Sequence, residues 1–566
     1  MILEEFLEFA NFIKEEDIEL SKFADYSINL KKVSKKSKKS EEEIINAVKS
    51  FFENYGKIEI KNGYVNIFLN WFKVLKDYKD KKLIKDRKIG KILVEHTSAN
   101  PNKALHIGHI RNACLGDSIY RFLKAFENEV YSASYIDDTG AQMAELLLAF
   151  LKLNYPLETD EKFDVYCSKV YSEVNKELEK NKELEEEKQK IIKELENVES
   201  EVFKFNENLV KRILKEQLKT LEFLKIKFDF LNKESDIISF ELIEPTINFL
   251  KEKGIAYYSK EKENCLVVKE QNTELVLVRS NNTYTYLAKD IAYAFWKHKI
   301  INKNFLFEKF NDTFITSRNG IKIENFENFD FSVNVIGREQ ALNQLFIQKL
   351  LESFGKKYVY YPYGLVFLSG KTAKLFNKEA KMLKMSGRKG IVVLADELIN
   401  KFKEVVSQSF KENVDEIVRS CIRYEMLKLD KDKDMLFDFE EALDIKGNSA
   451  VYLLYSYARI NSIINKAEKI DSMFEEYELE KEEIEVLKRV FYLDIVLLRT
   501  LRDLKINRLC SYIFELSQAL NLFYEKCRVL DEVENKKVFR LNLLFLLKRI
   551  YDFIFDIIGI EKINKI

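Results

Sequence analysis

The sequence is poor in several residue types that usually mark special structural roles. Its 566 residues include only four prolines, four histidines and six cysteines, and 93 basic side chains balance 93 acidic ones. The balanced charge excludes binding of nucleic acid through overall positive charge, so any nucleic acid must meet local patches and aromatic side chains. The cysteines are far apart and form no Cys-x-x-Cys pair. This spacing argues against a structural zinc site and is typical of a reducing compartment.

Targeting segments and long apolar runs are also missing. The segment 1–8 is acidic and amphipathic, unlike a signal peptide. The most apolar late stretch, 541–560, contains four charged residues and is therefore not expected to span a membrane. With 46% apolar and 33% charged residues, the composition indicates a soluble globular protein of several domains. We expect a cytoplasmic protein.

The scarce residues are concentrated in one stretch, 94–120. It holds one of the four prolines and three of the four histidines, which are His96, His106 and His109. A short apolar run, 91–96, predicts a buried parallel strand, and apolar residues at helical spacing follow Gly108. The pattern therefore predicts a strand, a loop and a helix, with a His-Ile-Gly-His turn where the helix begins.

This turn has the features of a phosphate-binding or nucleotide-binding site. Free backbone amides and the positive end of the helix dipole favour a phosphate there. Gly108 has no Cβ and lets a nucleobase or a sugar approach the backbone. His106 and His109 are about one helical turn apart, so both imidazoles could donate hydrogen bonds to a phosphate. For the motif alone, a metal site or a pair of core histidines is the alternative.

Two further motifs narrow the interpretation. The segment 384–390, Lys-Met-Ser-Gly-Arg-Lys-Gly, packs three cations and two glycines into seven residues, which is typical of a mobile loop that closes over a triphosphate. Tyr286 and Asp290 are four residues apart and share one helix face, and Glu234 stands in a polar turn. These three side chains could hold a cationic ligand, whereas a cap or a surface position is the simpler alternative for each.

Together these motifs resemble the two signatures of class I aminoacyl-tRNA synthetases, and the flanking residues are similar to the arginyl-tRNA synthetase family. The resemblance covers nearly the whole chain and rests on the segments 95–109, 138–142, 279–293, 385–390, 447–459 and 540–561. It implies an α/β fold with a Rossmann-like parallel-sheet catalytic domain, helical insertions, a small α/β N-terminal domain and an all-α C-terminal helical bundle. The implied domains are 1–80, 81–395 with inserted helices at about 155–220, and 396–566.

The resemblance also implies an activity and a role for each matching residue. The expected enzyme uses ATP, with Mg²⁺ assisting the phosphates, to activate L-arginine and then transfers it to the 3′ end of tRNA(Arg). Arginine presents a charged planar fork of donors, so its site needs carboxylates and other acceptors. The matching arginine-binding positions are Ser98, Asn100, Glu234, Tyr286, Asp290 and Gln340. The ATP-binding and catalytic positions are Lys103, His106, Gly108, His109, Lys384, Met385 and Ser386.

The sequence departs from the family pattern at two places. Gly387 stands where the family usually has a second loop lysine, and Lys103 resembles the substitute found just before the histidine turn, with Lys389 as a rival. The chain has Ile566 where the family more often has a final methionine.

The resemblance assigns tRNA contacts outside the catalytic domain. From about residue 400 the apolar spacing is helical and proline is absent, which suits a bundle that binds the far end of an elongated RNA. The tyrosines that match anticodon-stacking positions are Tyr452, Tyr455 and Tyr524, although a tyrosine at helical spacing is more often a core residue. Residues 1–80, with a lysine cluster at 31–39, would bind the outer corner of the tRNA.

Three alternatives remain open at this point. The chain could be a class I synthetase for another amino acid, a smaller nucleotidyltransferase with the same histidine turn, or a non-catalytic tRNA-binding relative. The helical C-terminal third disfavours the second, and the presence of His106, His109 and Lys384 disfavours the third. We expect the protein to be a monomer.

Overall fold

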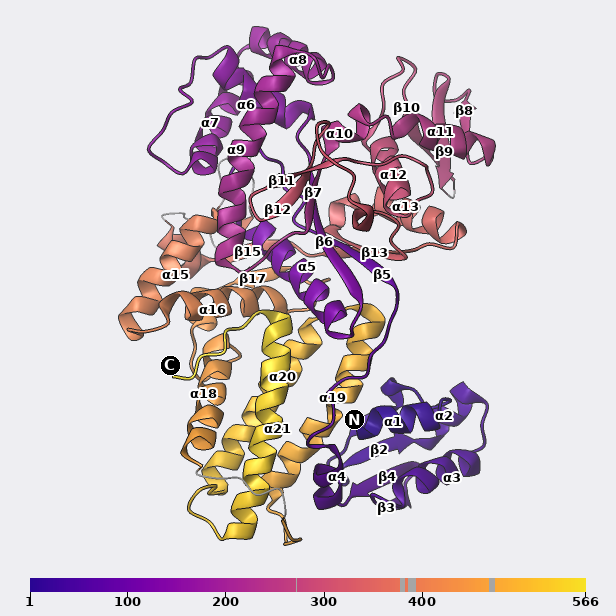
Figure 1. Cartoon of the computed structure of the whole chain (residues 1–566), viewed down its shortest axis with the longest axis vertical. Coiled ribbons are helices and arrows are strands. Elements are labelled where there is room, and N and C mark those ends of the chain that lie inside the picture. The colour runs from indigo at the N-terminus through magenta and orange to yellow at the C-terminus, as the bar shows by residue number, and fades with distance from the viewer. Residues whose placement is uncertain (271, 377–381, 385–392, 468–473, 566) are drawn as a thin grey trace. The chain divides into compact units, whose positions relative to one another are not determined.

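The computed structural model describes residues 1–565 except 271, 377–381, 385–392 and 468–473, and the chain forms two compact units (Figure 1). The larger unit comprises Arg87–Glu404 and Lys431–Asp438. The smaller unit comprises Met1–Asp86, Val405–Asp430 and Phe439–Ile566. The mixed α/β architecture, with a mainly parallel sheet, a small N-terminal sheet and a helical C-terminal part, confirms the predicted fold class.

Among the described residues, a seven-stranded sheet forms the centre of the larger unit. Its order is β11 (Phe307–Phe310), β12 (Thr313–Thr316), β7 (Phe230–Lys233), β6 (Glu129–Ile136), β5 (Lys91–Glu95), β13 (Phe331–Gly337) and β14 (Lys357–Tyr363). All neighbours are parallel except β11 and β12. The chain proceeds from β5 through β6 to β7 on one side and adds β13 and β14 on the other. Open α/β sheets bind ligands at the carboxyl ends of the strands beside such a reversal.

The sequence explains the central strands. Strand β5 carries Ile92, Leu93 and Val94 in succession, and all three are fully buried, as expected for a parallel strand covered on both faces. Apolar runs in the sequence predict strands at 129–136 and 227–231. Strand β6 has the predicted bounds, whereas β7 begins three residues later and ends two residues later than predicted. Its last residues, Asn232 and Lys233, are polar but buried. They continue the strand because Asn232 accepts a hydrogen bond from the Tyr293 hydroxyl and Lys233 pairs with acidic side chains.

Helices cover the sheet and extend the larger unit. The helices that connect or flank the parallel strands are α5 (Ile107–Ala125), α6 (Gly140–Leu151), α10 (Glu234–Ser239), α11 (Ile243–Glu252), α12 (Tyr286–Lys297) and α13 (Ala341–Ser353). Between β6 and β7 the chain inserts α7 (Phe163–Leu178), α8 (Lys182–Leu195) and α9 (Glu201–Phe223). Figure 1 shows these three helices gathered beside α6, which contacts α7 and α8. The long charged helices expected in this part of the sequence are therefore present.

Two small sheets complete the larger unit. One contains β8 (Ala256–Ser259), β9 (Cys265–Glu270) and β10 (Thr273–Val278), all antiparallel. The other joins β15 (Val366–Ser369) to β16 (Met382–Lys384) and β17 (Met435–Phe437), with α14 (Gly370–Leu375) after β15 and the beginning of α15 (Ala395–Ser409) further along the chain. Strand β17 interrupts the region after residue 400 that was expected to be almost wholly helical, because it pairs in parallel with β15.

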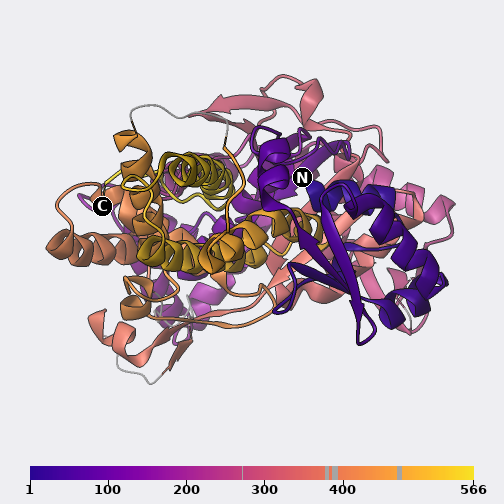
Figure 2. The same ribbon diagram turned by 90° about the horizontal axis from the view of Figure 1, so that it is seen from below.

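The smaller unit combines a four-stranded antiparallel sheet with long helices. The sheet order is β1 (Ile18–Leu20), β2 (Tyr26–Asn29), β4 (Tyr64–Leu69) and β3 (Gly56–Lys61), flanked by α1 (Ile2–Phe9), α2 (Leu30–Ser37), α3 (Glu41–Phe52) and α4 (Trp71–Tyr78). The remaining helices are α16 (Val414–Lys428), α17 (Phe439–Ala442), α18 (Ala450–Lys466), α19 (Lys481–Asp503), α20 (Asn507–Lys526) and α21 (Glu534–Ile558). Figure 2 views the yellow C-terminal helices nearly end-on.

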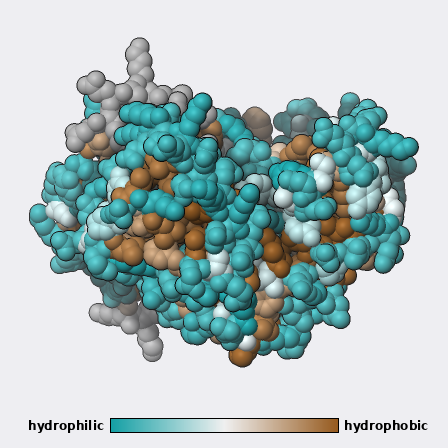
Figure 3. All heavy atoms as spheres, turned by 90° about the horizontal axis from the view of Figure 1, so that it is seen from above, coloured by the Kyte–Doolittle hydropathy of each residue, from teal (hydrophilic) through white to brown (hydrophobic). Residues whose placement is uncertain are grey.

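The small sheet packs on helix α19. The Tyr26 hydroxyl donates to the Lys488 carbonyl oxygen at 2.8 Å, and the rings of Trp71 and Phe491 lie 5.8 Å apart. Strands β1 and β2 were not predicted because each is short and its apolar alternation spans too few residues to stand out. None of the helices in the described ranges combines the length and apolar content that a bilayer crossing requires. Hydrophilic side chains cover most of the face shown in Figure 3.

Candidate active site

A cavity of about 710 Å³ opens where β5, β6, β7 and β13 end. Its lining contains all the residues predicted to bind arginine and the three predicted residues of the histidine turn: Ser98, Asn100, Glu234, Tyr286, Asp290, Gln340, His106, Gly108 and His109. They come from loops and helices that are far apart in the sequence. The parallel sheet brings them together because the carboxyl ends of its strands meet at one edge.

Helix α5 begins directly after His106, which is its N-cap residue. The Nδ1 atom of His106 accepts hydrogen bonds from the backbone N–H groups of Gly108 and His109, at 3.1 and 3.3 Å. The Nδ1 atom of His109 accepts from the backbone N–H of His106 at 3.2 Å, and the two rings stack with centroids 3.7 Å apart. Because both Nδ1 atoms are acceptors, each neutral ring carries its proton on Nε2.

This geometry corrects one expectation about the turn. The backbone amides are not free for a phosphate, because Gly108 and His109 donate to the His106 ring and Ile107 donates to the Val393 carbonyl oxygen. Burial and the nearby Lys103 charge lower the pKa of His106 to about 4, and burial likewise lowers the pKa of His109 well below its usual value. Both imidazoles therefore stay neutral near pH 7. Their Nε2–H groups, rather than backbone amides, are the donors that the turn offers.

Lys103 lies beside the cavity. Its Nζ atom donates to Gln142 Oε1 at 3.1 Å, and Gln142 is part of the lining. The same atom is 5.0 Å from the ring centroid of Tyr171. The Lys103 charge acts on both histidines of the turn and contributes to the lowering of their pKa values.

Most of the predicted basic loop lies outside the described residues. This applies to Met385, Ser386, Gly387 and the rival lysine, Lys389, and also to the last residue, Ile566. The backbone of Lys384 is described and pairs with Phe367 as the last residue of β16. The loop's contacts with ATP therefore stay a prediction from the sequence.

Among the described residues, five carboxylates line the cavity: Glu95, Asp137, Glu234, Asp290 and Glu339. Two of them form ion pairs. Glu95 Oε2 is 2.7 Å from Lys297 Nζ, and Glu234 Oε1 is 2.6 Å from Lys289 Nζ. Glu339 is exposed to solvent. The remaining two carboxylates, Asp137 and Asp290, have no basic partner in the described part of the chain.

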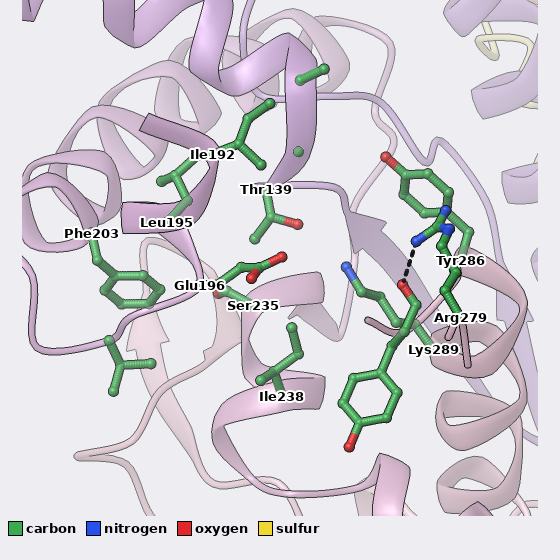
Figure 4. A pocket seen from close by; sticks show the side chains of 14 residues that line it. Thr139, Ile192, Leu195, Glu196, Phe203, Ser235, Ile238, Arg279, Tyr286 and Lys289 are labelled. Carbon is green, nitrogen blue, oxygen red and sulfur yellow. Dashed lines mark hydrogen bonds between the residues drawn. The ribbon is translucent and has the colours of Figure 1, made fainter. Parts of the chain in front are cut away.

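The pair between Glu234 and Lys289 is held by its surroundings. Glu234 also accepts hydrogen bonds from the Thr139 and Tyr135 hydroxyls, at 2.7 and 3.0 Å. Thr139, Lys289 and Tyr286 also line a smaller neighbouring pocket of about 200 Å³ (Figure 4). Glu234 was expected in a polar turn, but it is the buried first residue of α10. An acidic residue is favourable there because of the positive end of the helix dipole.

The two carboxylates without an ion pair in the described part of the chain both have a raised pKa. Burial, together with the charges of Glu234 and Glu95, raises the pKa of Asp290 to about 7. Burial, together with Glu234 and Asp138, raises the pKa of Asp137 to about 7. A cation bound near either group would favour its charged form and lower its pKa again.

A small polar group surrounds Asp137. The Asn100 Nδ2 atom donates to Asp137 Oδ2 at 2.7 Å. Asp137 Oδ1 and the Ser98 hydroxyl are buried and have no hydrogen-bond partner among the described residues. Tyr286 and Gln340, by contrast, are exposed side chains of the lining.

Several lining residues were not predicted from the sequence. They are Glu95 with its partner Lys297, and the hydrogen-bonded group Asn334, Gln344 and Tyr358. Lys289, the ion-pair partner of Glu234, was not predicted either. Asp137 follows a predicted strand within a polar segment, which is a usable signal. That Asp137 forms no ion pair with a described residue, however, becomes visible only when all the neighbouring side chains are in place.

The predicted anticodon tyrosines lie on two helices of the smaller unit. Tyr452 and Tyr455 belong to α18, and Tyr524 belongs to α20. Tyr455 is 42% exposed, whereas the other two are half-buried. Arg459 lies 5.5 Å from the ring centroid of Tyr524, so a cation and aromatic rings share this part of the unit.

Comparison with known proteins agrees with these features. Residues 72–313 match the family described as tRNA synthetases class I (R), catalytic domain, and residues 453–566 match the DALR anticodon binding domain. The parallel sheet, the histidine turn and these matches define a class I aminoacyl-tRNA synthetase.

The individual relatives specify the amino acid. The chain is 31% identical to the arginine–tRNA ligase of Thermococcus sibiricus, over 90% of this chain and 87% of the relative. It is 32% identical to that of Pyrococcus furiosus, over 89% and 87%. The solved Thermus thermophilus arginyl-tRNA synthetase matches with a TM-score of 0.83 and 25% identity, covering 96% of this chain and 94% of that one. The chain therefore belongs to the arginyl-tRNA synthetase family, and its activity is the ATP-dependent aminoacylation of tRNA(Arg) with arginine.

Proposed function

We propose that the cavity binds arginine and ATP side by side, with the carboxylates taking the amino acid and the histidine turn taking the nucleotide. The observation that carries this proposal is the common cavity itself, which joins the acidic residues Glu234 and Asp290 to His106 and His109. A cationic amino acid and an anionic nucleotide are complementary to these two halves.

In the acidic half, Ser98 and Asn100 hold the main-chain groups of arginine. The side-chain pocket is formed by Glu234, Tyr286, Asp290 and Gln340. Asp290 suits the guanidinium because it has no basic partner among the described residues, and a planar fork of donors favours a carboxylate. Glu234 is already held by Lys289, so its position is set before the substrate arrives.

In the histidine half, ATP lies on Gly108 with its phosphates near the Nε2–H groups of His106 and His109. Lys384, Met385 and Ser386 of the basic loop approach the same phosphates, and Lys103 replaces the loop lysine that is absent at Gly387, with Lys389 as the alternative. The arginine carboxylate attacks the α-phosphorus in line, which forms arginyl-adenylate and releases pyrophosphate. Fixed neutral donors stabilise the charge that develops on the phosphate oxygens. The terminal ribose hydroxyl of the tRNA then takes the arginyl group.

Mg²⁺ enters this proposal as a companion of ATP. The described residues contain no group of three or more potential ligands among His, Cys, Asp and Glu side chains that could hold a metal ion. Mg²⁺ commonly binds through substrate phosphates and retained waters, with few protein ligands. We therefore assign no side chain to it and derive no step through it.

The remaining assignments concern tRNA, assembly and location. Tyr452, Tyr455 and Tyr524 stack on anticodon bases, which suits exposed or half-buried rings next to a cation. We also propose that the protein works as a monomer. It is cytoplasmic, in agreement with six free cysteines among the described residues.

Arginine-dependent exchange of labelled pyrophosphate into ATP tests the proposed site. We expect exchange with arginine and none with the other amino acids, and measurement with and without cognate tRNA shows whether activation requires the RNA. If the Asp290→Asn variant exchanges pyrophosphate with arginine at the wild-type rate, the cavity is not the arginine site.

A further inference from the structure

We propose that Asp137 binds the α-ammonium of arginine, so that the amino acid is held by a carboxylate at each of its two positive groups. This inference rests on the arginine site proposed above and extends it by one residue. It makes Asp137 a substrate-binding residue that determines specificity for an α-amino acid.

The first argument is charge complementarity. Free arginine carries two positive groups, the guanidinium and the α-ammonium, and one carboxylate. Glu95 and Glu234 are each neutralised by a lysine, and Glu339 is exposed to solvent. Two enclosed carboxylates without a basic partner in the described residues remain, Asp137 and Asp290. The number of enclosed carboxylates without an ion pair among the described residues thus equals the number of cations on the substrate.

The second argument is the location of Asp137. It follows β6 and is hydrogen-bonded to Asn100, one of the two residues proposed to hold the main-chain groups of arginine. Asp290 comes from helix α12 instead. The neighbouring charges also differ, since Asp138 acts on Asp137 and Glu95 acts on Asp290, while Glu234 acts on both. The two carboxylates therefore come from different elements of the cavity wall and have partly different charged neighbours.

The third argument is unsatisfied hydrogen bonding. Asp137 Oδ1 is buried and accepts no hydrogen bond in the described chain, although its Oδ2 atom is occupied by Asn100. A buried acceptor without a donor is unfavourable, and hydrogen bonds from an ammonium to a carboxylate are among the strong ones. The Asn100 contact fixes the orientation of the carboxylate, and the ammonium supplies the donor that the protein leaves out.

Binding of three ligands to the full-length protein, without ATP, tests this assignment. The ligands are L-arginine, 5-guanidinopentanoate, which is arginine without its α-amino group, and L-citrulline, in which a neutral urea replaces the guanidinium. Calorimetry on the wild type, Asp137→Asn and the matched Asp290→Asn variant gives the nine dissociation constants.

We expect Asp137→Asn to weaken arginine binding by roughly 30-fold or more, since it truncates one partner of a buried charge pair. Its affinity for 5-guanidinopentanoate should stay within about threefold of the wild type, which also shows that the cavity is intact. Asp290→Asn should instead lose the preference for arginine over citrulline. Asp137→Ser serves as a second variant should the asparagine form fail to fold.

Two results would overturn the assignment. Equal weakening of arginine and 5-guanidinopentanoate in Asp137→Asn would mean that Asp137 only positions Asn100. Unchanged arginine affinity would mean that Asp137 does not meet the substrate. If Asp290→Asn also binds arginine like the wild type, the proposed arginine site itself is wrong, and this outcome is distinct from failure of Asp137 alone.

Discussion

The two halves of the cavity contain ionisable groups that burial drives in opposite directions. In the histidine half, burial lowers the pKa of both imidazoles, so His106 and His109 remain neutral donors. In the acidic half, burial raises the pKa of Asp137 and Asp290 to about 7, so these groups are only partly charged until a cation arrives. The comparison teaches that one enclosed site can offer permanent neutral donors to a phosphate and inducible negative charge to an amino acid.

The largest effect of a single substitution on activity is expected in the acidic half of the cavity. Asp290→Asn should lower kcat/KM for arginine by a factor on the order of 10² to 5 × 10³, equivalent to about 3–5 kcal/mol, because a guanidinium would enter a buried site without its carboxylate. The KM for ATP should change little. Pyrophosphate exchange at varied arginine and ATP concentrations measures both parameters. Glu339→Gln is the matched control, since this carboxylate of the same cavity is exposed and its loss should cost less than about threefold.

The second effect belongs to the histidine half. His106→Asn should lower kcat by roughly 10²-fold, because it removes an Nε2–H donor at the phosphates. Asparagine is a good N-cap residue, so the melting temperature should stay close to that of the wild type. His106→Ala should lose the donor and also about 1 kcal/mol of stability with the cap. Equal kcat values in the wild type and His106→Asn would show that the ring serves only as a cap.

The KM values for arginine and for ATP should depend differently on pH, because the two halves of the cavity titrate differently. A carboxylate with a pKa of about 7 is mostly protonated at pH 6, and only its charged form attracts the substrate cation. The KM for arginine should therefore rise at least tenfold as the pH falls from 8 to 6. The histidines keep one protonation state over this range, so the KM for ATP should not follow their titration. An arginine KM that is flat with pH would contradict the comparison.

The smallest effect concerns a residue that belongs to neither half. Tyr455→Ala should raise the KM for tRNA by about 1 kcal/mol, roughly fivefold, if its exposed ring stacks on a base. The KM for arginine in pyrophosphate exchange should not change. Tyr455→Phe keeps the ring and should behave like the wild type in aminoacylation assays. A similar loss in both variants would indicate that the hydroxyl, rather than stacking, is responsible.

The sequence predicted the fold and the composition of the cavity well where the signal is local. The apolar spacing of 41–52 predicts a helix and that of 129–136 predicts a strand. Helix α3 and strand β6 have these bounds, because the periodicity spans enough residues. The placement of the histidine turn where a helix begins followed from Gly108 and the apolar residues after it. The short strands β1 and β2 offered no comparable pattern.

The rest of the site depends on contacts that no local pattern encodes. The ring of His106 caps helix α5 and accepts hydrogen bonds from backbone amides that were expected to bind a phosphate. This contact depends on the side-chain geometry of a single turn. The pairing of Glu95 with Lys297 joins residues 202 positions apart. Asp137 stands out only because Lys297 and Lys289 are already engaged by other carboxylates.

Proton release on arginine binding tests the central claim most directly. Calorimetry at pH 7 in two buffers of different ionisation enthalpy measures the protons exchanged. If the substrate cations bind to Asp137 and Asp290, each about half protonated beforehand, roughly one proton should leave per arginine at pH 7, and clearly fewer at pH 8. Binding with no proton release at pH 7 would contradict the account.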